Sequence, residues 1–370
     1  MSTEKPILAF VHLGRRKVNF LVANISRIKK LFPDVKIVVI YDEQSSHLPN
    51  VVRDVDFFEY KRELRVEKQL HFNPVSQRFR QGFWQFTLER FFALTQFHKS
   101  FPASSIIHLE SDVLILPSFP FDKFSKLKSI YWSRFNESKD VAAILFLPNL
   151  EESSWLESEL VNQLKLDSRL TDMTVLSKIA HLYPERIQIL PSIDQSRNSK
   201  LLNKANTEVK NDFELISQQL DFFEGIFDPA AIGMWLCGID PENNHGKLVL
   251  HSPSFIETGD SFIDPGGADY QIDNFGRLYI RCEKGLIPIH NLHVHSKDIK
   301  LFSRNWITEI RKYISVTSRP EIIRKKIFRN YRRVYFSHLK QGDVFRYLSS
   351  HPSIYPRAQS LVSLLRKLSD

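Results

Sequence analysis

Apolar positions in the first part of the chain follow strand and helix patterns in turn. Residues 6–13 and 35–41 are short, nearly continuous apolar runs, and residues 18–32 between them place apolar side chains at helical spacing until Pro33. A continuous apolar run is typical of a strand buried on both faces, and a 3.6-residue spacing is typical of a helix with one buried face. The succession of strand, helix and strand predicts a βαβ unit, the opening of a nucleotide-binding α/β fold.

The alternation continues downstream. Two more segments have strand patterns, three have helical patterns and one has the pattern of a hairpin: 141–147 and 187–190, then 82–98, 150–166 and 171–182, and finally 270–281. Strands that alternate with helices predict a sheet covered by helices. The predicted fold class is therefore α/β, with a mixed sheet flanked by helices.

Two acids follow one of the buried strand patterns. Residues 105–109 are mostly apolar, and Glu110, Ser111 and Asp112 come next, before a second apolar run at 113–116. Open α/β sheets bind their ligands at the carboxyl ends of strands, and paired carboxylates there attract a divalent cation. The alternative is a strand-end cap or a solvated turn.

A second polar edge lies near residue 290. In a strand over 286–297, His293 and His295 share one face, and Lys297 follows them. Oxygen ligands with an added imidazole favour Mn²⁺ over Mg²⁺, although Mg²⁺ remains an alternative. Lys297 would offer a positive charge to a diphosphate beside the ion. Which of the two histidines binds the metal stays open.

The loop after the first strand lacks phosphate-binding glycines. It contains neither Gly-x-Gly-x-x-Gly nor a Walker motif, so a metal ion would have to replace those backbone donors. Asp42, after the second strand, is a candidate partner for a ribose or a base, with a turn cap as the alternative. Arg90 falls away from the thickest part of the aromatic stripe in 82–98. It is a second candidate for binding the nucleotide ligand, which is the sugar donor of the function predicted below.

A segment with two Asp-Pro pairs offers candidates for a catalytic base. Asp228 and Asp240, each followed by proline, flank a short helix that contains Gly233. Glycine there permits close approach of another backbone. Asp228 is the first candidate and Asp240 the second, and both have the alternative of a helix or turn cap.

Charge is distributed unevenly. The chain of 370 residues has a net charge of +9, but residues 301–370 hold 15 Lys and Arg against 4 Asp and Glu, while residues 1–300 hold 36 against 38. A body near neutrality argues against nucleic acid as a partner. We therefore divide the chain into a catalytic domain at 1–300 and a basic helical extension at 301–370.

The extension contains a basic amphipathic pattern at 320–340. This pattern is typical of a helix on an anionic membrane surface, and the alternative is a helix docked on the main domain. The start of the sequence lacks the pattern of a signal peptide, no apolar run is long enough to span a bilayer, and Cys237 and Cys282 are too few for a disulfide framework. We expect a cytoplasmic protein, peripheral on the cytosolic face of a membrane if the pattern binds lipid.

These residues resemble the metal-dependent glycosyltransferases of the GT-A fold. Glu110-Ser111-Asp112 is similar to the Asp-x-Asp signature of that family, with Glu in the first position, and the segments 227–233 and 291–297 look similar to bacterial and viral polysaccharide glycosyltransferases. The resemblance implies that Asp112 ligates the metal, that Glu110 reaches the ribose or sugar, and that His293 or His295 completes the metal shell. It also implies a Rossmann-like nucleotide-diphospho-sugar transferase fold.

The predicted function is the transfer of a sugar from a nucleotide-diphosphate donor, a UDP-sugar, to a glycan or lipid-linked glycan acceptor. Whether the reaction inverts or retains the anomeric configuration stays open. One alternative is a nucleotidyltransferase that makes sugar nucleotides, although the Gly-rich basic loop of such enzymes is absent. The other is a non-enzymatic adaptor that binds a membrane or nucleic acid through its basic tail.

Overall fold

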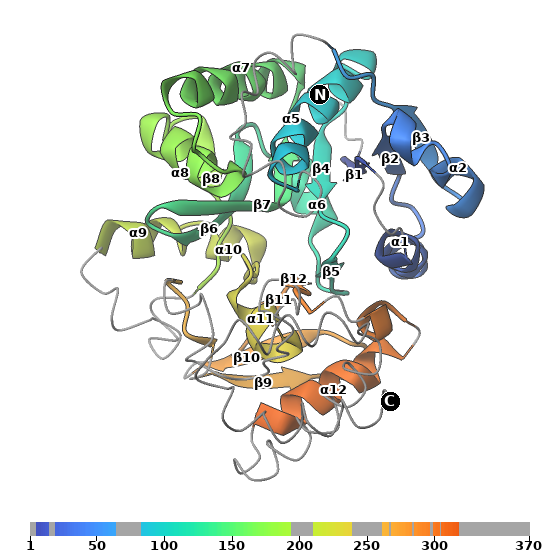
Figure 1. The fold of residues 1–370 in the computed structure, drawn as a ribbon. Helices are drawn as coiled ribbons and strands as arrows, with labels where there is room; N and C mark the ends of the chain where they lie inside the picture. The colour runs from blue at the N-terminus through green and yellow to red at the C-terminus, as the bar shows by residue number, and fades with distance from the viewer. Residues whose placement is uncertain are drawn as a thin grey trace, which may run out of the picture.

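A mostly parallel sheet forms the centre of the molecule (Figure 1). The computed structural model describes residues 5–14, 19–63, 83–193, 210–238, 261–265, 268–282, 285–296, 299–303 and 305–317. Within these residues the sheet has the order β3-β2-β1-β4-β7-β6-β8, and of its strands β7 alone runs antiparallel to its neighbours. The strands are β1 (Ile7–His12), β2 (Ile37–Tyr41), β3 (Asp56–Glu59), β4 (Ile106–Leu109), β6 (Ile130–Asn136), β7 (Lys139–Leu147) and β8 (Ile187–Ile189). The predicted mixed α/β fold is confirmed.

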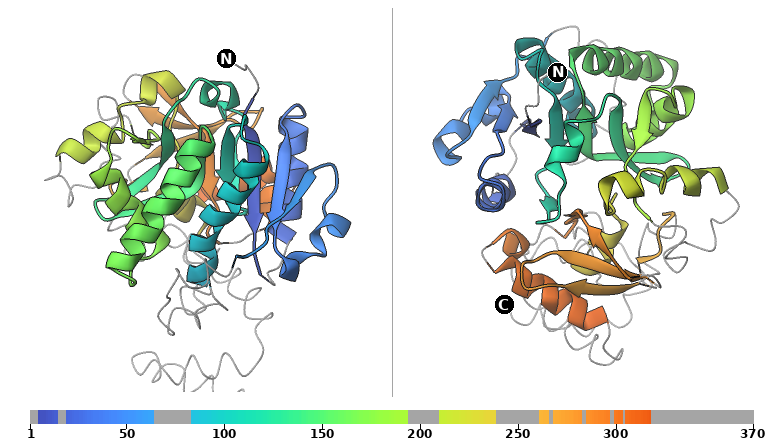
Figure 2. Two further views of the ribbon diagram at one scale, coloured as in Figure 1. Left: turned by 90° about the horizontal axis from the view of Figure 1, so that it is seen from above. Right: turned by 180° about the vertical axis from the view of Figure 1, so that it is seen from behind.

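Three helices lie together on one side of this sheet, as both views show (Figures 1 and 2). They are α5 (Phe83–Ser100), α7 (Leu150–Leu166) and α8 (Asp172–Leu182). Polar side chains fix the starts of α7 and α8: Asn149 accepts a hydrogen bond from the Glu152 N–H of α7, and Thr171 and Thr174 form a capping box at α8. The helical patterns in the sequence therefore predicted the helices that cover the sheet.

The carboxyl-terminal part of the described chain forms a smaller antiparallel sheet. It contains β9 (Asp269–Ile272), β10 (Leu278–Cys282) and β11 (Gly285–Ile289), and α12 (Trp306–Thr317) packs against β9. Between the two sheets, β5 (Val113–Ile115) pairs with β12 (Asn291–His293), as Figure 1 shows. This short pair connects the strand that follows the two acids with the segment that contains the late histidines.

The remaining helices complete the described fold. They are α1 (Asn19–Leu31), η1 (Glu43–Ser45), α2 (Leu48–Val51), α6 (Phe121–Phe124), α9 (Lys210–Leu215), α10 (Leu220–Phe223), α11 (Ala231–Cys237) and η8 (Ile299–Phe302). Helix α11 is the short helix expected between the two Asp-Pro pairs. Helix α1 packs against η8, which joins the first βαβ unit to the carboxyl-terminal part of the chain.

The structure differs from the sequence patterns at several elements, among them two strands and the segment of the late histidines. Strands β3 and β6 were not predicted, because both carry polar residues within short runs. The single strand expected over 286–297 is interrupted at His290 and forms β11 and β12, which belong to different sheets. His295 therefore lies beyond the end of β12.

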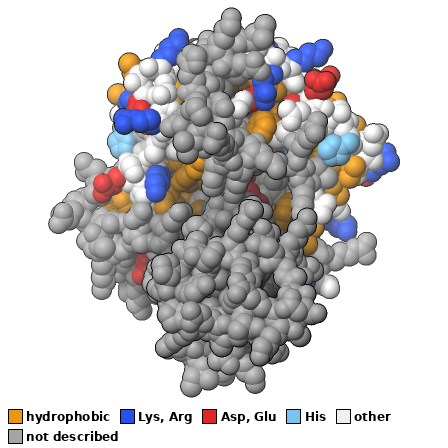
Figure 3. All heavy atoms as spheres, in the orientation of Figure 1, with side chains coloured by type: hydrophobic (Ala, Val, Ile, Leu, Met, Phe, Trp, Pro, Cys, Tyr) orange, Lys and Arg blue, Asp and Glu red, His pale blue; other side chains and the backbone are white. Residues whose placement is uncertain are grey.

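Parts of the predictions fall outside the described residues. Asp240, Lys297 and the basic pattern at 320–340 are among them, and the boundary at residue 300 stays a prediction. Within the described part of the chain, no helix combines the length and the apolar character that crossing a bilayer requires. On the face shown in Figure 3, the Lys and Arg side chains of described residues lie at separate points around the upper part of the molecule.

Candidate metal and donor site

Glu110 and Asp112 lie at the carboxyl end of β4, in the tight turn that leads to β5. The N–H of Glu110 donates to the Ala143 carbonyl on β7 at 3.0 Å, and the N–H of Val113 closes the turn onto the Glu110 carbonyl at 3.1 Å. In the sheet, β1 lies between β2 and β4, so the strand order reverses beside this turn. Ligands of open α/β sheets bind at such a reversal. The two acids therefore occupy the expected binding edge.

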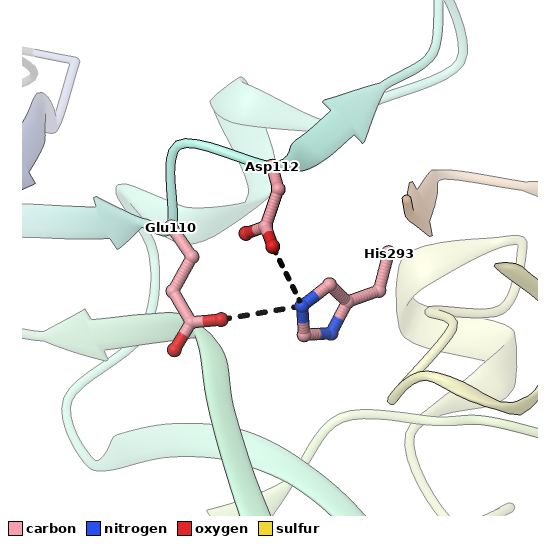
Figure 4. Close-up of side chains that lie close together, drawn as sticks. All are labelled: Glu110, Asp112 and His293. Carbon is pink, nitrogen blue, oxygen red and sulfur yellow. Dashed lines mark ion pairs between the residues drawn. The ribbon is translucent and has the colours of Figure 1, made fainter. Parts of the chain in front are cut away.

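Pairing of β5 with β12 brings His293 to the same place. Val113 is opposite His293 in the antiparallel register, and the N–H of Val294 donates to the Asp112 carbonyl at 2.9 Å. The imidazole faces both carboxylates (Figure 4), with Nε2 3.4 Å from Glu110 Oε2 and 3.6 Å from Asp112 Oδ2. The structure thus joins two acids and a histidine that are far apart in the sequence.

The three side chains fit a divalent cation. Their ligand atoms all lie within 4.8 Å of one another. Ligand atoms about 2.1 Å from one ion and at right angles to each other lie about 3 Å apart, so small side-chain movements would place all three on a shared ion. Two carboxylate oxygens and one imidazole nitrogen suit a hard or borderline cation such as Mn²⁺ or Mg²⁺. The resemblance implied that Glu110 reaches the ribose or sugar of the donor. In the structure Glu110 lies among the candidate metal ligands.

His295 lies next to His293 but outside the group of candidate metal ligands. Its ring centroid is 4.3 Å from that of His293, and its N–H donates to the His293 carbonyl at 3.0 Å. Among the described residues, the group with metal-binding geometry contains His293 and not His295. The role of His295 in metal binding stays a prediction.

Helix α1 fixes the backbone of the acidic turn. The side-chain amide of Asn24, which is buried, donates to the carbonyls of Ser111 at 3.1 Å and Val113 at 2.8 Å, on either side of Asp112. Sequence analysis missed this residue. The available signal was its position on the buried helix face between Leu21 and Ile28, where a polar residue needs a partner.

Arg90 joins Glu110 to a third acid. Its guanidinium forms an ion pair with Glu110 through Nη1 and donates to Asp172 Oδ2 through Nη2 at 2.8 Å. Burial raises the pKa of Asp172, and Arg90 opposes that shift. Burial also acts against the charged form of Glu110, but Arg90 and His293 outweigh it and lower the Glu110 pKa. The sequence pattern did not indicate Asp172 as a member of this cluster.

Asp42 follows the carboxyl end of β2, which β1 separates from β4 in the sheet. Both of its oxygens accept the N–H of Gly14, at 3.1 and 3.0 Å, and Ser45 Oγ donates to the Gly14 carbonyl at 2.6 Å. Gly14 has a positive φ of 77°, which favours glycine at this exit from β1. These contacts are those of the turn cap given above as the alternative. The donor-binding role of Asp42 stays a prediction.

Asp228 is buried beneath the histidine. Its side chain accepts the N–H groups of Ile232 at 2.9 Å, Gly233 at 2.7 Å and His293 at 3.0 Å, and only 1% of the residue is exposed. Burial raises its pKa, and the three N–H groups oppose the shift. The contacts with α11 are those of a helix cap, so the role of catalytic base stays a prediction.

Neither a protein-family model nor a curated protein sequence matches the chain. Solved structures that align with part of it include the glycosyltransferase GlyE of Streptococcus pneumoniae TIGR4, with 13% identity and a TM-score of 0.36 over 50% of this chain and 45% of GlyE. The galactosyltransferase LgtC in complex with donor and acceptor sugar analogs aligns with 12% identity and a TM-score of 0.36, over 57% of this chain and 83% of LgtC. Mouse xyloside xylosyltransferase 1 aligns with 13% identity and a TM-score of 0.34, over 57% of this chain and 93% of the xylosyltransferase.

The alignment with GlyE spans less than half of that protein. Because these TM-scores are below 0.5, we infer function from the site itself.

Proposed function

We propose that this chain is a metal-dependent glycosyltransferase that transfers a sugar from a nucleotide-diphosphate donor, a UDP-sugar, to a glycan acceptor. The observation that supports it is the Glu110, Asp112 and His293 cluster at the point where the strand order of the sheet reverses. A nucleotide diphosphate is the ligand class that needs both a strand-end pocket and a divalent cation when phosphate-binding glycines are absent.

Asp112 and His293 would hold the cation, together with Glu110. When bound, the ion would neutralise negative charge on the departing diphosphate as a Lewis acid. Arg90 keeps Glu110 ionised and oriented through their ion pair. Each side chain of the cluster therefore has a contact or a charge that suits the proposed role.

Asp42 and Gly14 would form the nucleotide side of the site. Although both Asp42 oxygens accept the Gly14 N–H, an ionised carboxylate has about four acceptor positions in total. It can therefore also accept a ribose hydroxyl while it caps the turn after β1. This leaves the anomeric carbon of the donor on the diphosphate side, near the acids.

The proposed reaction breaks the anomeric C–O bond to the diphosphate and forms a new bond from the same carbon to an acceptor hydroxyl oxygen. The hydroxyl proton passes to a protein base if configuration inverts, and Asp228 and Asp240 are the candidates. If configuration is retained, a diphosphate oxygen of the leaving group can accept it. NMR of the product's anomeric proton distinguishes the two courses. The basic pattern at 320–340 suits a lipid-linked acceptor on the cytosolic face of a membrane.

A thermal-shift panel tests the proposal. Nucleotide sugars are added singly, with and without Mn²⁺, to the wild type and to the Asp112→Asn variant. A bound donor at about 100 times its dissociation constant stabilises the protein by about 2.7 kcal/mol. We expect stabilisation by a UDP-sugar only with Mn²⁺, and none in Asp112→Asn.

The matched control is Asp122→Asn, an acid whose side chain is 79% exposed and which lies outside the cluster. It should behave as the wild type. Hits are then assayed for transfer to glycan acceptors. Equal stabilisation and turnover in Asp112→Asn and the wild type would refute the proposal.

A further inference from the structure

The dipeptide Asp228-Pro229 holds His293 at two points. Asp228 Oδ2 accepts a hydrogen bond from the backbone N–H of His293 at 3.0 Å. The Pro229 carbonyl oxygen is 3.4 Å from the ring nitrogen Nδ1 of His293. In the neutral imidazole that a metal requires, a proton on Nδ1 that faces a carbonyl leaves Nε2 as the unprotonated nitrogen. Nε2 is the atom that faces Glu110 and Asp112. The dipeptide therefore restrains both the backbone and the ring of the histidine.

Asp228 is itself rigidly fixed. The side chain of Asn291 accepts the Asp228 N–H at 3.1 Å and donates to the Asp228 carbonyl at 2.9 Å. The carboxylate of Asp228 also accepts the N–H groups of Ile232 and Gly233 in the first turn of α11. One buried carboxylate thus ties α11 to β12.

Gly233 allows this contact. A Cβ built at Gly233 would lie 2.1 Å from the His293 carbonyl oxygen and 2.8 Å from Asp228 Oδ2. Any other residue would push β12 away from α11. The close approach of α11 to β12 therefore occurs at the backbone of the metal-binding residue.

We infer that Asp228 is a positioning residue for His293, acting through backbone and Pro229 contacts, and is not the catalytic base. This inference deepens the proposed function and rests on it. A base must reach the acceptor hydroxyl, whereas the Asp228 carboxylate is buried and already accepts three N–H groups. Residues that orient a metal-binding histidine typically change metal affinity 10- to 100-fold when they are replaced.

The test measures Mn²⁺ binding by electron paramagnetic resonance, with Mn²⁺ alone as the probe. Asp228→Asn keeps the shape of the side chain but turns an NH₂ group toward backbone N–H donors. We expect its Mn²⁺ dissociation constant to rise about 10- to 100-fold. Pro229→Ala keeps the carbonyl but frees its orientation, and we expect a smaller loss of affinity in a variant that folds.

Asn149→Ala is the matched control. It removes a side chain that caps α7, far from the cluster in sequence, and a lost cap costs about 1 kcal/mol of stability. Chemical denaturation should show a loss of stability for this variant, while its Mn²⁺ affinity equals that of the wild type. This separates a general loss of stability from a specific effect on the metal site.

Turnover at rising Mn²⁺ concentration separates the two roles of Asp228. A positioning role predicts that excess Mn²⁺ restores most of the turnover of Asp228→Asn. A base role predicts wild-type Mn²⁺ affinity with turnover that excess metal leaves low, and that result would overturn the inference alone. Absence of Mn²⁺ binding by the wild type would overturn the proposed function and the inference together.

Discussion

Two clusters of buried charge, one on β6 and β7 and the other at the carboxyl end of β4, differ in how the charges of their described residues are balanced. On β6 and β7, Asp140 accepts Trp132 Nε1 at 2.8 Å and Arg134 Nε at 2.9 Å, and both charged residues are almost fully buried. Asp140 and Arg134 form a buried ion pair. Since buried ion pairs are favourable only with good geometry and further hydrogen bonds, this cluster has the form of a structural element.

Among the described residues, the cluster at the end of β4 holds more carboxylates than guanidinium groups. Glu110, Asp112 and Asp172 surround one guanidinium, that of Arg90, and one imidazole, that of His293. The cluster also reaches the surface, because the Glu110 side chain is 23% exposed. Excess buried carboxylates raise the free energy of the folded state unless a cation binds. The proposed binding site differs from the cluster on β6 and β7 in two respects: its described residues include more carboxylates than guanidinium groups, and it reaches the surface.

The largest effect is expected from Asp112→Asn. This change should weaken Mn²⁺ binding by about 100-fold or more, since metal ligands must carry the deprotonated carboxylate. It should leave the unfolding free energy of the metal-free protein unchanged or raise it, because it removes one of three crowded acids. Titration calorimetry and urea denaturation measure the two quantities. A large destabilisation without metal would show that the two clusters have the same role.

The opposite pattern is expected from Asp140→Asn. It removes the carboxylate from the buried ion pair with Arg134, and breaking a buried pair costs about 3–5 kcal/mol. Urea denaturation should show this loss, while Mn²⁺ affinity measured well below the melting temperature stays at the wild-type value. A variant that kept its stability but lost Mn²⁺ would contradict the structural role assigned to Asp140.

The sequence predicted the sheet edge that carries Glu110 and Asp112 better than it predicted the elements and side chains around them. The apolar runs of β1, β2, β4 and β7 and the helical spacing of α7 and α8 are local signals, and they located Glu110 and Asp112 correctly at a strand end. Strand β6 escaped prediction because Ser133, Arg134 and Asn136 interrupt its pattern. Asp140 on β7 forms an ion pair with Arg134 and so offsets the cost of burying its charge in β6. A pattern of local residues does not include this contact across the hairpin.

The choice between the histidines also depended on distant contacts. A continuous strand would place His293 and His295 on one face, but the chain leaves β11 at His290 and pairs with β5 only through His293. The pairing of β5 with β12 joins segments that are remote in the sequence. Asp228 remained ambiguous for the same reason, since its contact with the His293 N–H exists only in the folded chain.

A buried histidine outside both clusters gives a third, smaller effect. His290 packs its ring against Phe227, and burial lowers its pKa from 6.5 to about 4. Between these values the unfolded chain binds a proton that the folded protein does not, so the stability contribution is complete above pH 6.5 and declines as the pH falls toward 4. The shift corresponds to about 3 kcal/mol.

Replacement of His290 by glutamine should remove this pH dependence. Glutamine stays neutral and can still donate to the Phe223 carbonyl, which is 3.2 Å from His290 Nε2. Urea denaturation at pH 7 and at pH 4.5 should show that the variant loses less stability on acidification than the wild type. Equal losses in the two proteins would mean that His290 is already protonated at pH 4.5 without cost to the fold.

The smallest effect is expected where an ion pair is exposed. Arg281 on β10 is 3.0 Å from Asp269 on β9, and the two side chains are 56% and 62% exposed. Solvent screening limits such pairs to about 0–1 kcal/mol, so the coupling energy from Arg281→Gln, Asp269→Asn and the double variant should fall in that range. It should decrease further in 1 M salt, where charges are screened within about 3 Å. A coupling energy near that expected for Asp140 and Arg134 would show that pairing, and not burial, determines the cost of breaking these clusters.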